Sequence, residues 1–372
     1  MNCSGIVRSA ALAALFTLTR ADLALAQSSF PADSTVRAIL SDRVARKRAM
    51  GLVVATFEQG RAPQVYTAGV SGLAGLALDA STVFEIGSIT KIFTNTVLAD
   101  MVLKGEVRLD DPVAKFLPAR VRVPERKGRK ITLADLATQS SGLPRLPTNI
   151  SPTDATNPYA DYSVTQLYEF LSSYVLPRDI GSQYEYSNLA MGLLGHVLAL
   201  KAGKSYEALV KERVLAPLGM SETGITLNPS MKRHMAQGFN GHGAPVPLWD
   251  IPTLAGAGAL RSTANDMLKF LAANLDSASI PLGKSMAMAQ ASRKVIGPNN
   301  SIGLGWNIVQ LFGTSVTWHN GGTGGFRTYI GMDTEHHRGV IVLSNSTISP
   351  DDIGFHLLVP QIPLEGAPRS QD

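Results

Sequence analysis

Segments with the pattern of β-strands lie near both ends of this 372-residue chain, and this arrangement constrains the fold more than any other feature. Near the start, 51–57 and 64–69 are rich in β-branched and aromatic residues and flank a short turn. Near the end, three further segments have the same character: Val316–His319, Phe326–Met332 and Gly339–Ser344. If these strands share one core, the two ends must meet in one sheet. We therefore predict an α+β fold whose antiparallel sheet is formed by the two terminal segments.

The middle of the chain changes to the apolar spacing of helices. The clearest predicted helices are 91–103, 164–173, 189–200, 206–214 and 264–274. These features predict one domain at 27–372. In it, a sheet region of about 30–85 and 300–372 is flanked by helices and joined to an inserted, mainly helical region of about 90–295. The expected place for a site is the cleft between the two regions.

The first 26 residues have the order of features found in secretory signal peptides. Arg8 precedes an apolar stretch at 9–18, and Ala24-Leu25-Ala26 offers the small residues that a signal peptidase accepts. We predict a signal peptide at 1–26 and a periplasmic or secreted mature protein; an uncleaved amphipathic N-terminus is the alternative. The apolar stretch is well short of the roughly 20 residues needed to cross a bilayer. We therefore expect no stable membrane insertion once the signal is removed.

Cysteine and charge content exclude several classes of protein. The single cysteine, Cys3, lies in the predicted signal peptide. The mature protein would therefore lack disulfides, thiolate metal sites and a cysteine nucleophile. A net charge of +5 is small and scattered, which argues against a nucleic-acid partner. It is compatible with work near an anionic polymer such as a cell wall.

The strongest local signal is the sequence from Gly87 to Lys91, at the start of a predicted helix. Residues three apart on a helix share a face, so Ser88 and Lys91 can come within hydrogen-bond reach. A serine hydroxyl becomes a strong nucleophile when a neighbour takes its proton. A lysine can take it only when its pKa is lowered from about 10.4, as burial beside other cations does. The alternative is a capped helix with a solvated lysine.

Two further polar clusters follow. Tyr186 and Asn188 point the same way in an extended turn before a predicted helix, although Ser187 or Asn188 could instead be a helix N-cap. The segment from His319 to Phe326 is rich in glycine, which leaves a strand edge bare for a substrate backbone. Backbone N–H groups of this segment, with that of Ser88, could form an oxyanion hole. The alternative is a glycine-rich hairpin turn with a surface histidine.

These three clusters resemble the S-x-x-K, Y-x-N and K-T-G motifs of the serine β-lactamase and penicillin-binding-protein superfamily. Five more segments are similar to that family: Val107–Val113, Ile131–Pro144, Pro217–Met220, Gly258–Thr263 and Gly303–Trp306. The likeness covers most of the mature chain. It is closest to class C β-lactamases and the related D-alanyl-D-alanine carboxypeptidases.

The resemblance implies a role for each matching position. Ser88 is the expected nucleophile, Lys91 its general base and Tyr186 the group that shuttles the proton. The expected substrate-binding residues are Asn188, His319, Gly321 and Gly322, the last through its backbone N–H. We expect no cofactor and no metal, and a small-molecule or peptidoglycan-derived substrate. Adjacent histidines point apart on a strand, so His336 and His337 are poor metal ligands.

One position departs from the family pattern. His319 stands where the third motif has a lysine, which binds a substrate carboxylate and helps lower the pKa of the first lysine. Because histidine is mostly uncharged at neutral pH, we expect weaker and pH-dependent carboxylate recognition. No glutamate matches the deacylating residue of class A enzymes; Glu85 and Glu185 are expected to be structural. Tyr66, Tyr159, Tyr162 and Tyr168 have no motif context and are expected in packing or at the surface.

Three functions remain open from the sequence. The first is an exported hydrolase of β-lactams or D-alanyl-D-alanine-type peptides that passes through an acyl-serine. The second is an esterase or D-aminopeptidase with the same catalytic residues, which a histidine at position 319 favours. The third is a penicillin-binding protein that is acylated without turnover.

Overall fold

The computed structural model describes Met1, residues 29–278 and residues 280–365. The predicted signal peptide and its cleavage site fall almost entirely outside these residues. Within the described part of the chain, no helix is both long enough and apolar enough to cross a membrane.

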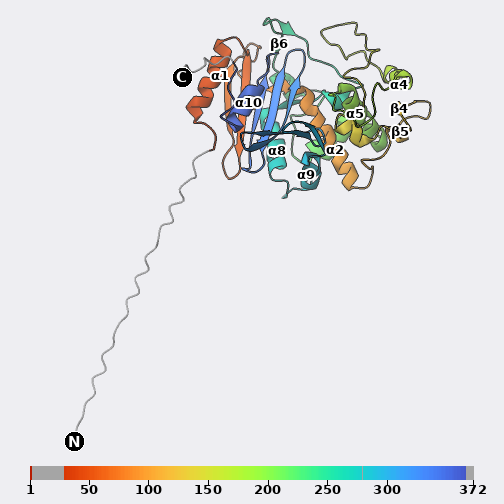
Figure 1. Cartoon of the computed structure of the whole chain (residues 1–372). Coiled ribbons are helices and arrows are strands. Elements are labelled where there is room, and N and C mark those ends of the chain that lie inside the picture. The colour runs from red at the N-terminus through yellow and green to blue at the C-terminus, as the bar shows by residue number, and fades with distance from the viewer. Residues whose placement is uncertain (2–28, 279, 366–372) are drawn as a thin grey trace.

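An eight-stranded antiparallel sheet joins the two ends of the chain, as predicted (Figure 1). Its strands in spatial order are β2 (Gln64–Gly69), β1 (Gly51–Glu58), β14 (Arg338–Ser344), β13 (Arg327–Asp333), β12 (Thr314–Gly322), β11 (Asn307–Leu311), β10 (Asn300–Ile302) and β9 (Lys294–Gly297). The join lies at β1, where Val54 stands opposite Tyr66 on one side and Val342 on the other. The strands β9–β11 extend the sheet beyond the five strands that the sequence predicted.

Helices lie on both faces of this sheet, and others form the inserted helical region. They are α1 (Asp33–Ala45), α2 (Thr90–Leu103), α3 (Leu133–Ala137), α4 (Val164–Ser173), α5 (Asn188–Ala202), α6 (Tyr206–Val210), α7 (Pro229–His234), α8 (Ala264–Leu275), α9 (Gly283–Gln290) and α10 (Asp351–Leu358). The predicted helix at 206–214 is divided: α6 ends at Val210 and a π-helical turn, Lys211–Leu215, follows it. Pro217 prevents the α-helix from running further, because its ring would clash with the carbonyl four residues earlier.

Alternation along the strands divides the core into two layers. On β1, Leu52 and Val54 face one side of the sheet, whereas Val53 and Ala55 face the other. The first side is covered by α1 and α10, through Val36, Leu40, Ile353 and Leu357. The second side packs against the helical region, including α2 and α8. The molecule therefore has a sheet between two helical layers, with the larger apolar core on the side of the helical region (Figure 1).

Three short strand pairs lie outside the main sheet: β3 (Val83–Glu85) with β8 (Arg261–Thr263), β4 (Glu125–Arg126) with β5 (Arg129–Lys130), and β6 (Gly238–Phe239) with β7 (Pro245–Val246). The β3–β8 pair matters for the site, because β3 leads directly into the turn before α2. The N–H of Ile86 donates to the carbonyl of Leu260 at 3.1 Å, which extends this anchoring to the residue before the turn.

Candidate active site

Ser88 lies in a single 3₁₀ turn, Gly87–Ile89, between β3 and α2. Gly87 has a φ of 52°, in the left-handed region that favours glycine. A Cβ placed there would lie 2.5 Å from the backbone nitrogen of Gly322. Glycine at 87 therefore allows the end of β12 to lie directly beside the serine.

Lys91 follows in the first turn of α2, and its side chain is completely buried. Its Nζ lies 2.9 Å from Ser88 Oγ, 2.9 Å from Asn188 Oδ1 and 2.7 Å from the carbonyl oxygen of Ala257. The last two oxygens can only accept hydrogen bonds, whereas a hydroxyl can also donate. An ammonium satisfies all three contacts by donating to each oxygen, whereas a neutral amine satisfies them by donating to Asn188 and Ala257 and accepting from Ser88.

The electrostatic surroundings favour the neutral form of Lys91. Burial holds the pKa of the Lys91 amine well below its usual value, and the positive charge of Arg145 lowers it further. The expected contact between Ser88 and Lys91 is therefore present, with the lysine buried rather than solvated. Its role as general base stays a prediction.

The lowered pKa of Lys91 predicts a pH-dependent stability. Below its usual pKa of about 10.4, Lys91 binds a proton in the unfolded chain, while the folded protein resists that proton. The free energy of unfolding should therefore rise with pH between the lowered pKa and the usual one, by at most about 1.4 kcal/mol per pH unit. In Lys91→Met this contribution is absent, so the stability of the variant relative to the unmutated protein should fall from pH 6 to pH 9. Urea unfolding at several pH values measures this difference; a constant difference would mean that the buried amine is charged.

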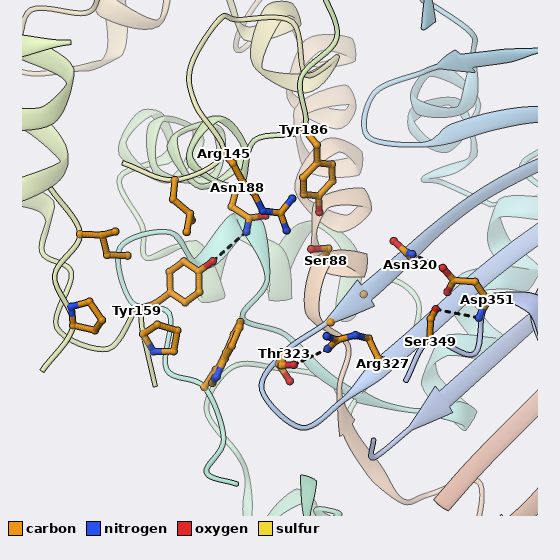
Figure 2. Close-up of a pocket in the computed structure, with 17 residues that line it drawn as sticks. Ser88, Arg145, Tyr159, Tyr186, Asn188, Asn320, Thr323, Arg327, Ser349 and Asp351 are labelled. Atoms are coloured by element: carbon orange, nitrogen blue, oxygen red, sulfur yellow. Dashed lines mark hydrogen bonds between the residues drawn. The ribbon is translucent and has the colours of Figure 1, made fainter. Parts of the chain in front are cut away.

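Tyr186 lies above Ser88, and its hydroxyl points toward the serine (Figure 2). Burial raises the pKa of Tyr186, although the Ser88 hydroxyl and the charge of Arg145 oppose that rise. The resting side chain is therefore a neutral phenol. A neutral phenol can give its proton to a leaving group, while Lys91 is better suited than Tyr186 to take one.

Asn188 begins α5, which is capped by Ser187. Its Oδ1 accepts from Lys91, and its Nδ2 donates to the hydroxyl of Tyr159 at 3.1 Å. Both ends of the amide are thus held. Tyr159 packs in the apolar core, as expected, and also lines the cavity at the site. Its position depends on a long loop, and no local pattern marks it in the sequence.

The end of β12 provides a bare backbone edge beside Ser88. β11 follows β12 only as far as the pair Asn307–Trp318, so His319 to Gly322 lie beyond it. Because the N–H of Thr323 donates to Phe326 across the hairpin, alternation directs the N–H of Gly322 away from β13 and toward the serine turn. A Cβ on Gly321 would lie 2.0 Å from the carbonyl oxygen of Ile86, so glycine is required there for this approach.

His319 lies behind this edge rather than in the cavity. Only 2% of its surface is exposed, and its Nδ1 donates to the carbonyl of Asn320 at 2.6 Å. Burial lowers the pKa of His319 to about 3. The ring is therefore neutral across the physiological range and supplies no cation there. The expectation of a pH-dependent carboxylate contact from a pKa near neutrality is wrong, because it assumed an exposed ring.

A cavity of about 820 Å³ opens above Ser88 (Figure 2). One wall is largely apolar, with Leu146, Ile150, Pro152, Pro158, Tyr159 and Trp249. The opposite wall is polar, with Asn320, Thr323, Arg327, Ser349 and Asp351. Two arginines reach the cavity, Arg145 and Arg327, and neither was singled out from the sequence. Each follows directly on a segment that resembles the family, at Pro144 and at Phe326, and this adjacency is the one signal that could have indicated them.

Other residues near the motifs have structural partners. Glu85 is buried and accepts a hydrogen bond from the backbone of Trp249 at 2.8 Å, and it faces Arg261. Glu185 pairs with Arg178. Neither glutamate is among the residues that line the cavity in the described part of the chain.

Comparison with known proteins gives a family match that includes all the residues of this site. A profile of the family described as Beta-lactamase matches residues 36–357, which include the site from Ser88 to Asp351. The chain is 31% identical over 284 residues to the D-alanyl-D-alanine-carboxypeptidase/endopeptidase AmpH of Escherichia coli, over 70% of each chain. It is 30% identical over 305 residues to a beta-lactamase of Yersinia enterocolitica, over 79% of this chain and 72% of the relative. For a beta-lactamase of Escherichia coli the identity is 26% over 345 residues, covering 83% and 88%.

Proposed function

The chain belongs to the beta-lactamase family, and from this premise we propose that it is an exported serine hydrolase acting through an acyl-Ser88 intermediate. The proposed substrates are β-lactams or D-alanyl-D-alanine-type peptides. The observation that carries the proposal is the buried position of Lys91 Nζ, 2.9 Å from Ser88 Oγ, from which a neutral amine can accept the serine proton.

In the proposed acylation, Ser88 Oγ bonds to the substrate carbonyl carbon and its proton passes to the neutral amine of Lys91. The negative charge that develops on the carbonyl oxygen is stabilised by the backbone N–H groups of Ser88 and Gly322. As the carbon–nitrogen bond breaks, Tyr186 gives a proton to the leaving amine and is reprotonated from Lys91. Deacylation repeats these transfers with water as the nucleophile.

The two walls of the cavity favour an acyl donor that has an apolar group at one end and a polar group at the other. The wall with Tyr159 and Trp249 suits an apolar group, and the wall with Asn320 and Arg327 suits a polar one. Relatives named as a D-alanyl-D-alanine carboxypeptidase and as beta-lactamases support the choice of substrates. An esterase is the second candidate, favoured by the neutral, buried His319.

Three substrates tested on one preparation distinguish these functions: nitrocefin, a D-alanyl-D-alanine peptide and a short p-nitrophenyl ester. We expect each substrate that reacts to leave an acyl group on Ser88. Turnover should be fastest on nitrocefin or on the D-alanyl-D-alanine peptide. Turnover of the ester alone would favour the esterase. A stable penicilloyl-Ser88 without turnover would favour a penicillin-binding protein.

Arg327 is the cation on the polar wall that suits a substrate carboxylate. Its Nη1 donates to the carbonyl oxygens of Thr323 and Phe326, which fixes the guanidinium beside Gly322. We expect Arg327→Gln to lower kcat/KM by about tenfold or more for a carboxylate-bearing substrate, since a charge-assisted hydrogen bond is lost. A neutral ester should change less than about twofold.

The matched control is Arg122→Gln, at an exposed arginine that does not line the cavity. Equal losses of Arg327→Gln on the charged and neutral substrates would mean that Arg327 supports the hairpin rather than a carboxylate.

Export is part of the proposal and rests on residues 1–26. Expression of the full chain in a bacterium, followed by fractionation and N-terminal sequencing, tests it. Mature protein that begins at Gln27 in the periplasm or medium supports export. Full-length protein retained in the cytoplasm would contradict it.

A further inference from the structure

Because His319 is buried and neutral, it does not place a positive charge beside Lys91. A base that must stay neutral benefits from a nearby permanent cation, because that charge opposes protonation. His319 supplies no such charge, since its pKa is lowered to about 3. The side chains around Tyr186 show which residue can supply it.

Two basic side chains lie over the ring of Tyr186. Lys91 Nζ is 4.9 Å from the ring centroid, and Arg145 Cζ is 5.1 Å from the same centroid. Figure 2 shows the guanidinium of Arg145 extending into the cavity beside Tyr186 and Ser88. This spacing is within the range at which a guanidinium is attracted to an aromatic ring.

The backbone of Arg145 fixes where this side chain starts. Its carbonyl oxygen accepts hydrogen bonds from the N–H groups of Asn188 at 3.0 Å and Leu189 at 3.2 Å, at the start of α5. These bonds tie the loop of Arg145 to the segment that carries Tyr186 and Asn188. The backbone of Arg145 is therefore fixed close to the ring, although the residue is exposed.

The charged and titratable groups that face Tyr186 come from several elements. They are Lys91 from α2, Arg145 and Tyr159 from the loops after α3, Tyr184 from the segment before α5, and His319 from β12. The tyrosines are neutral phenols, and Lys91 must lose its charge to act as a base. The guanidinium of Arg145 is then the permanent positive charge in this set.

We propose that Arg145 is a positioning residue that holds the Tyr186 ring and places a permanent positive charge beside the proton path from Ser88 to Lys91. This inference rests on the proposed acyl-serine function. The charge disfavours the protonated form of Lys91 and so adds to the effect of burial, which already lowers the pKa of that amine. At Tyr186 the same charge opposes the rise in pKa that burial causes. Arg145 acts through these two side chains and not by contact with the reacting carbonyl.

The test measures phosphonylation of Ser88 by an uncharged fluorophosphonate between pH 5 and pH 9. In this reaction Ser88 Oγ bonds to phosphorus, fluoride leaves, and the serine proton passes to Lys91. The probe carries no carboxylate, so substrate recognition by arginine does not enter the rate. Intact mass gives the labelling rate for the unmutated protein, Arg145→Gln, Arg145→Lys and the control Arg122→Gln.

We expect Arg145→Gln to label about fivefold more slowly at pH 6 and to approach the unmutated rate at pH 9. The reason is that removal of the charge raises the pH at which Lys91 becomes neutral. Arg145→Lys keeps a charge and should retain the pH profile. An unchanged profile in Arg145→Gln, equal slowing at every pH, or equal behaviour of the Gln and Lys variants would overturn the proposal.

Failure of the proposed function gives a different result. If the unmutated protein is not labelled on Ser88 at any pH, the acyl-serine function is refuted, and the role of Arg145 with it. If Ser88 is labelled but the profile does not depend on the charge at position 145, only the role of Arg145 is refuted.

Discussion

Replacement of Ser88 by alanine is expected to abolish both covalent labelling and turnover. The variant lacks the oxygen that bonds to the substrate carbonyl, and loss of a nucleophile of this kind typically lowers kcat by about 10⁴- to 10⁶-fold. Because Ser88 is only partly buried and its hydroxyl is small, the fold should be retained. Intact mass spectrometry after incubation with a penicillin or ester, together with initial rates, measures both effects.

The control for this variant is Ser292→Ala, at an exposed serine that does not line the cavity. It should keep full labelling and turnover. Activity that persists in Ser88→Ala within about tenfold of the unmutated rate would show that another group is the nucleophile.

Replacement of Lys91 by methionine should lower the acylation rate by about 10³-fold, the middle of the range for a lost general base. Methionine fits the buried space of the lysine but cannot accept a proton. Lys91→Arg tests the same point with the charge retained, since a guanidinium cannot be deprotonated at physiological pH. Both variants should lose acylation to a similar extent, and stopped-flow or quenched labelling measures this loss.

Near-normal acylation in Lys91→Arg would mean that the site needs a positive charge at this position and not a base. Thermal unfolding shows whether each variant is folded. Lys91→Met provides the answer even if the larger arginine prevents folding.

The sequence predicts the buried strands of this fold better than its short edge strands and its first helix. The strands β1, β13 and β14 are recognisable because their apolar and β-branched residues are buried in the sheet. The strands β2 and β12 are recognisable from their β-branched and aromatic residues. The strands β9 and β10 have only four and three residues and are half exposed, so they carry no strand pattern. The helix α1 buries only Val36, Leu40 and Arg43, and its apolar stripe is too narrow to be seen in the sequence.

In the site, contacts between residues close in the sequence could be predicted, whereas contacts between distant residues could not. The approach of Lys91 to Ser88 follows from helical geometry, so a four-residue pattern predicts it. The contact of Tyr159 with Asn188 spans 29 residues and depends on how a loop folds. The burial of His319 depends on the turn Gly87–Ile89 and on Tyr186, which lie against β12 and which a strand pattern does not reveal. This is why the residue types of the motifs were predictable, whereas the cations around them were not.

The state of the Lys91 amine tests the account most directly. In protein labelled with ¹³C at the ε-carbon of lysine, the Lys91 resonance is identified by its absence in Lys91→Met and followed by NMR as the pH is varied. We expect an amine that is already neutral at the pH where Ser88 is acylated fastest, while exposed lysines remain charged. A Lys91 resonance that titrates together with those of the exposed lysines would contradict it.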